Sequence, residues 1–105
     1  MKNIFFIIFL LLFHSTIFSD ESNEKNLFQE YCWGCHHQTA QAFGPSFQSI
    51  ANKRSSAEII AQIIDPNSTY ISLGYKINSM PAFNDLKNNE LESLVTYIYK
   101  FKDKK

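Results

Sequence analysis

The stretch Cys32-Trp33-Gly34-Cys35-His36 carries the most specific chemistry of the chain and decides how the rest is interpreted. Two thiols at this spacing can each form a thioether bond with one vinyl group of the same porphyrin. The following imidazole then lies under the iron and can bind it as the proximal ligand. The pattern therefore predicts one covalently attached haem c per chain, bound through Cys32 and Cys35, with His36 on the iron.

Two other sites can be built on a Cys-x-x-Cys pair. A thioredoxin-like redox disulfide expects a βαβ setting, whereas the sequence around Cys32 is helix-like and has no alternating strands. A structural zinc site needs four ligands and usually a second pair of Cys or His. The chain has two cysteines, and His37, the other histidine of residues 20–105, directly follows His36. Haem attachment is the better interpretation of the pattern.

The N-terminal residues have the pattern of an export signal. A basic start at Lys2 precedes an unbroken apolar run over residues 4–13, and the chain turns polar at Asp20. This pattern predicts a signal peptide over residues 1–19 and one domain over residues 20–105. The alternative is an uncleaved membrane anchor, but a run of this length is marginal against the roughly 20 residues that a bilayer requires.

The charge of the chain narrows the class of partner. Ten basic residues balance ten acidic ones, which excludes a strongly basic nucleic-acid-binding protein. Lysines are concentrated at the C-terminal end, from Lys100 to Lys105. A tail of this kind can steer docking to an acidic partner, but we interpret it as a solvated helix end.

Apolar side chains recur at three- and four-residue spacing, which predicts an all-α domain. Pro45 is expected to open a short helix, and Ser55 or Ser56 to cap the next one, which stops before Pro66. Nothing resembles a strand ladder or a repeat. The expected helices are 24–32, 45–50, 57–64 and 89–102, and residues 66–87 are expected to form a long loop.

A second axial ligand must come from the face of the haem opposite His36. Thioether sulfur, imidazole and, less often, lysine amine are the candidate donors. His37 cannot reach across the porphyrin, and Met80 is the one thioether within residues 20–105. A methionine in a loop is usually a packing residue, but beside a haem we predict Met80 as the distal ligand, in a turn that Pro81 stiffens.

Four motifs, taken together, resemble a class I cytochrome c: Cys32-x-x-Cys35-His36, Gly44-Pro45, Met80-Pro81-Ala82-Phe83, and a closing helix with Leu94-Val95-Thr96-Tyr97-Ile98. The resemblance implies three main helices plus short ones wrapped round one haem, with His/Met ligation. It also implies attachment of the haem outside the cytoplasmic membrane, which agrees with the export signal and predicts the periplasm.

Two further site residues follow from this resemblance. In the family the carbonyl of the proline after the haem motif accepts the N–H of the proximal histidine, and Pro45 matches that position. The alternative is that Pro45 only turns the chain. Arg54 could pair with a haem propionate as a planar donor, or it could be a solvated arginine in a polar turn.

The chain also departs from the family pattern. Phe28 and Tyr97 match the aromatic positions where the first and last helices cross, but the expected small residue is replaced by Glu24. We therefore expect a looser or shifted crossing. Lys87 stands where the family often has a capping serine, and the cap of the last helix is expected at Asn88.

The function implied is one-electron transfer between redox proteins, without catalysis by this chain. The expected donor is a protein such as a quinol–cytochrome c reductase, and the expected acceptor is a terminal oxidase or peroxidase. The chain is expected to be a monomer with a positive midpoint potential. Alternatives are a haem-based sensor or gas-binding protein, or an electron-relay subunit of a larger oxidoreductase complex.

Overall fold

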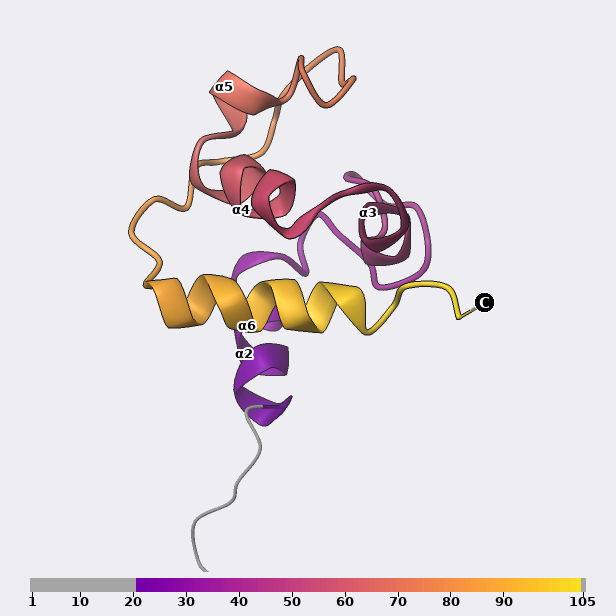
Figure 1. Cartoon of the computed structure of the whole chain (residues 1–105), viewed down its shortest axis with the longest axis vertical. Coiled ribbons are helices and arrows are strands. Elements are labelled where there is room, and N and C mark those ends of the chain that lie inside the picture. The colour runs from indigo at the N-terminus through magenta and orange to yellow at the C-terminus, as the bar shows by residue number, and fades with distance from the viewer. Residues whose placement is uncertain (1–20, 105) are drawn as a thin grey trace, which may run out of the picture.

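The computed structural model describes residues 21–104, and every regular element within them is a helix, as the sequence predicts (Figure 1). The predicted signal peptide, residues 1–19, lies outside the described residues. None of the helices in the described part is long and apolar enough to span a bilayer. The helices are α2 (Glu21–Tyr31), α3 (Phe47–Lys53), α4 (Ser56–Ile64), α5 (Pro66–Thr69) and α6 (Asn88–Tyr99).

The crossing of α2 and α6 forms the base of the core (Figure 1). The ring centroid of Phe28 on α2 lies 5.2 Å from that of Tyr97 on α6, so the expected aromatic contact is present. It also lies 5.1 Å from the ring centroid of Phe47 on α3. Glu24 is only 6% exposed, and its Oε2 lies 2.8 Å from Nζ of Lys100. A buried carboxylate neutralised by a lysine thus occupies the place where the family has a small residue.

The starts of α3 and α4 are determined by serine caps. Ser46 Oγ accepts the backbone N–H of Ser49 at 3.1 Å, so α3 begins at Phe47. The prediction that this helix starts at Pro45 was wrong. Of the two serines that could cap α4, Ser55 is the cap. Its Oγ accepts the N–H of Glu58 at 3.2 Å, and Glu58 Oε1 accepts the N–H of Ser55 at 2.9 Å, which is a capping box.

Three expectations for the C-terminal half were also wrong. The predicted loop over residues 66–87 contains α5, because Pro66 follows Asp65 directly and its fixed φ suits the first position of a helix. The last helix is capped at Lys87 and not at Asn88, since Glu90 Oε1 accepts the backbone N–H of Lys87 at 2.9 Å. That helix ends at Tyr99, earlier than predicted.

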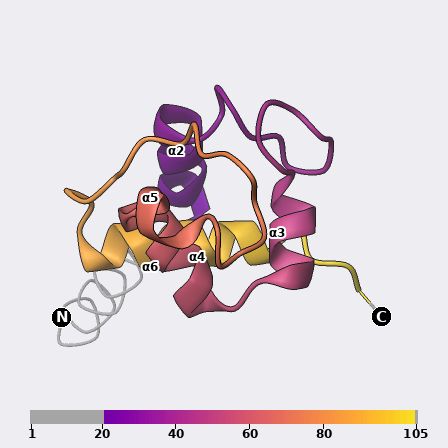
Figure 2. The same ribbon diagram turned by 90° about the horizontal axis from the view of Figure 1, so that it is seen from above.

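The segment between α5 and α6 forms one wall of the candidate site. In Figure 2 it extends from α5 toward α3 and returns past α2 before α6 begins. Its residues line a cavity together with residues of the haem motif, α3 and α4.

Candidate functional site

A cavity of about 740 Å³ lies between these segments, a volume typical of cofactor sites. Its walls are mostly apolar, with side chains from α3, α4 and α6. The structure brings all of the residues predicted from the sequence into this one cavity, where they line its wall: Cys32, Cys35, His36, Pro45, Arg54 and Met80.

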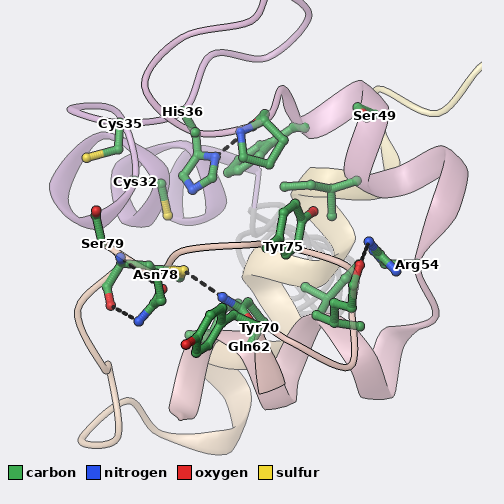
Figure 3. Close-up of a pocket in the computed structure, with 18 of the residues that line it drawn as sticks. Cys32, Cys35, His36, Ser49, Arg54, Gln62, Tyr70, Tyr75, Asn78 and Ser79 are labelled. Carbon is green, nitrogen blue, oxygen red and sulfur yellow. Dashed lines mark hydrogen bonds between the residues drawn. The ribbon is translucent and has the colours of Figure 1, made fainter. Parts of the chain in front are cut away.

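The haem motif follows the end of α2 as a tight turn. The backbone N–H groups of Cys35 and His36 both donate to the carbonyl of Cys32, at 3.1 and 2.9 Å. Cys32 is half-buried and Cys35 is exposed, and neither is in a disulfide. Figure 3 shows both thiols at one end of the cavity, on the same side as His36. This turn presents the two sulfur atoms and the imidazole to a single space.

The environment of Cys32 argues against the redox-disulfide alternative. Burial raises the pKa of the Cys32 thiol to about 12, with a smaller contribution from Cys35. Redox-active pairs need a cysteine whose pKa is lowered, because the thiolate is the nucleophile. The zinc alternative also lacks ligands, since residues 21–104 contain no group of three or more His, Cys, Asp or Glu side chains that could hold a metal.

His36 is held in one orientation by its surroundings. Its Nδ1 lies 2.7 Å from the carbonyl oxygen of Pro45, and because a carbonyl only accepts, Nδ1 carries the proton. The lone pair of Nε2 is therefore free to bind a metal ion. The ring also packs on Phe47, with centroids 5.5 Å apart. A Cβ added at Gly44 would lie 2.6 Å from Cε1 of His36, so glycine is required for this approach of chain to ring.

Met80 is held by its backbone. Its N–H donates to Asn78 Oδ1 at 3.0 Å, and its carbonyl accepts from Asn78 Nδ2 at 3.1 Å. The same Nδ2 donates to Asn67 Oδ1 of α5 at 2.9 Å. The position of Asn78, two residues before Met80, is a sequence signal for a side-chain turn, but the anchor at Asn67 depends on α5 and was missed by the sequence analysis.

Arg54 lies half-buried at the end of the cavity away from the cysteines (Figure 3). Its Nη2 donates to the carbonyl of Leu73, and its guanidinium stands 5.4 Å from the ring centre of Tyr75. Its Nε is buried without a hydrogen-bond partner. A buried donor of this kind is costly unless it is satisfied, so this end of the cavity suits an anionic group.

These features together fit a haem. The apolar walls suit a flat macrocycle, the two thiols meet one end of it, and the arginine at the other end suits its propionates. His36 on one side and Met80 on another offer the nitrogen and sulfur donors that haem iron takes in proteins.

Comparison with known proteins gives one family. A family model described as "Cytochrome C oxidase, cbb3-type, subunit III" matches residues 20–98 of the chain. The matched residues include the whole wall of the cavity. No curated protein matches the chain.

Proposed function

The chain belongs to the family of cytochrome c oxidase, cbb3-type, subunit III, and from this membership we propose that it transfers single electrons through a haem whose iron is bound by His36 and Met80. Membership in this family implies a covalently bound haem c and haem-based electron transfer. The observation that supports the ligand set is that both side chains line one cavity with Cys32 and Cys35.

The two cysteines, His36, Pro45 and Met80 have different tasks in this proposal. Cys32 and Cys35 bind the porphyrin through thioethers, and Nε2 of His36 binds the iron. The carbonyl of Pro45, 2.7 Å from Nδ1, keeps the imidazole in the required tautomer and raises its basicity. The sulfur of Met80 is the opposite ligand, presented by the turn that Asn78 holds.

The haem supplies a reversible one-electron change at iron, and the protein sets its potential. Methionine as an axial ligand raises the potential relative to a second histidine. Apolar walls act in the same direction, because a low dielectric disfavours the extra positive charge of the ferric state. The half-buried Arg54, with its unpartnered Nε, binds a propionate. We therefore expect a positive midpoint potential.

The proposed setting is the periplasm, after export by residues 1–19, with the protein acting as a monomer. The donor is a protein such as a quinol–cytochrome c reductase, and the acceptor is a terminal oxidase or peroxidase. Docking is proposed at the cavity edge near the exposed Cys35, through the small and transient kind of interface typical of electron transfer.

Optical spectroscopy of the purified holoprotein tests the ligand set. Sulfur-ligated ferric haem has a weak red absorption band, which we expect in the wild-type protein and not in Met80→Ala. Ile71→Ala is the matched control, because it removes apolar volume from the same segment at a residue that is 72% exposed. A high-spin ferric spectrum in the wild-type protein would contradict His/Met ligation and favour a haem sensor or gas-binding protein.

The family description favours a second candidate, in which the chain relays electrons as a subunit of a larger oxidase. Purification of a tagged chain from detergent-solubilised membranes separates the two. A stoichiometric complex with oxidase subunits and oxidase activity supports the relay. Recovery of the tagged chain as a free monomer supports the mobile carrier.

A further inference from the structure

The side chain of Gln62 lies beside the sulfur of Met80. Gln62 is on α4, half-buried in the cavity wall, and its Nε2 is 3.9 Å from Met80 Sδ. Figure 3 shows this contact as the dashed line from Gln62 that ends on a sulfur atom. Thioether sulfur is a weak acceptor, and its large radius makes its hydrogen bonds longer than those to oxygen. The amide N–H is thus in position to donate to this sulfur.

The amide of Gln62 also contacts Thr69 on α5. Oγ1 of Thr69 is 2.5 Å from Oε1 of Gln62, to which it donates. With the amide turned over, the Oε1 lone pairs of Gln62 would face the lone pairs of Met80 Sδ, which is repulsive. This repulsion sets Nε2 toward the methionine, and the hydroxyl of Thr69, which also faces the carbonyl of Asp65 at 3.2 Å, holds the oxygen end of the amide in place. Gln62, Thr69 and Met80 form a chain of three side chains from α4, α5 and the segment that follows.

We propose that Gln62 is a positioning residue that donates a hydrogen bond to the Met80 sulfur while this sulfur binds the iron, and that Thr69 orients it. The inference rests on the proposed His/Met ligation. A thioether has two lone pairs, of which the iron uses one, so the other remains available to the amide N–H.

This hydrogen bond has a definite effect on the redox equilibrium. It withdraws electron density from the sulfur and weakens its donation to the iron. The ferric ion depends on that donation more than the ferrous ion does, so the bond favours the ferrous state and raises the potential.

Redox titration of holoprotein variants tests the proposal. Gln62→Leu keeps the volume and removes the donor, and we expect the ferric-to-ferrous ratio at fixed potential to rise about two- to fivefold, as for a weak hydrogen bond. That change in ratio corresponds to a midpoint potential lower by roughly 20–40 mV, at 59 mV per tenfold change for one electron. Thr69→Val, which removes only the hydroxyl, should shift the potential in the same direction, and Thr69→Ser should restore it.

The control is Gln48→Leu, the same replacement at a half-buried glutamine of α3 that does not line the cavity. Its potential should equal that of the wild-type protein. If Gln62→Leu keeps the red band and its potential does not differ from that of Gln48→Leu, this inference is wrong while the ligation stands. Absence of the red band from the wild-type protein would overturn the ligation and this inference with it.

Discussion

Replacing Gly44 by alanine tests how closely the chain is fitted to the imidazole of His36. An ideal Cβ at residue 44 would lie 2.6 Å from Cε1, 2.9 Å from Nδ1 and 3.1 Å from Nε2 of His36. Non-bonded carbon atoms prefer about 3.5–4.0 Å, so either the ring or the loop must move by about 1 Å. The neighbours of the ring oppose that movement, because Phe47 packs on one side and the carbonyl of Pro45 binds Nδ1.

The cost of this movement has two contributions. Overpacking in a well-filled site costs typically 1–3 kcal/mol. Lengthening the 2.7 Å bond between His36 and Pro45 loses a further contribution of about 0.5–1.5 kcal/mol. We expect Gly44→Ala to lower the free energy of unfolding by about 2–4 kcal/mol.

Denaturant unfolding of the ferric holoprotein, followed by haem absorbance, measures this loss. Gly34→Ala is the matched control, because a Cβ there meets no atom within 4 Å and the residue lies in the same motif. Its free energy of unfolding should stay within about 1 kcal/mol of the wild-type value. Equal stabilities of Gly44→Ala and Gly34→Ala would refute the steric argument.

Two further predictions concern charged side chains and their partners. The backbone N–H of Ser55 holds the pKa of Glu58 below its usual range. Glu58→Gln should therefore be less stable than the wild-type protein. The difference in stability should be fully present above the unfolded pKa of about 4.3 and should vanish as the pH falls through the lower folded pKa. Thermal unfolding as a function of pH measures it, with Glu92→Gln, an exposed glutamate of α6, as the control for charge alone. Lys100→Met removes the cation 2.8 Å from the buried Glu24 and should cost about 1–2 kcal/mol in denaturant unfolding, given that Lys100 is partly solvated. Adding Glu24→Gln should recover part of that cost, and a double variant less stable than Lys100→Met would contradict the account.

Much of the helical arrangement could be predicted because its signals are local. The capping serine and the glutamate three residues later define the start of α4, and apolar periodicity defines α2 and α6. The errors arose where two local signals competed. Pro45 and Ser46 both favour a helix start, and the serine hydroxyl made the cap because it satisfies an N–H of the first turn. The short α5 was missed because Pro66 ends one helix and begins another.

The departure at Glu24 illustrates a different limit. The sequence alone predicts a looser crossing there, since a charged side chain replaces a small one. The structure places Lys100 beside it, and the carboxylate is buried because its charge is neutralised. Lys100 belongs to the lysine-rich C-terminal end, which the sequence alone led us to interpret as a solvated helix end.

The sequence by itself determined the covalent chemistry, the helical class and the candidate ligands, because each depends on residue spacing along the chain. The motif Cys32 to His36 is complete within five residues, and Met80 is the one thioether within residues 20–105. Only the tertiary structure decided that Met80, Pro45 and Arg54 line one cavity with the cysteines. It alone placed Gln62 against the sulfur, because that contact depends on how α4, α5 and the following segment pack together.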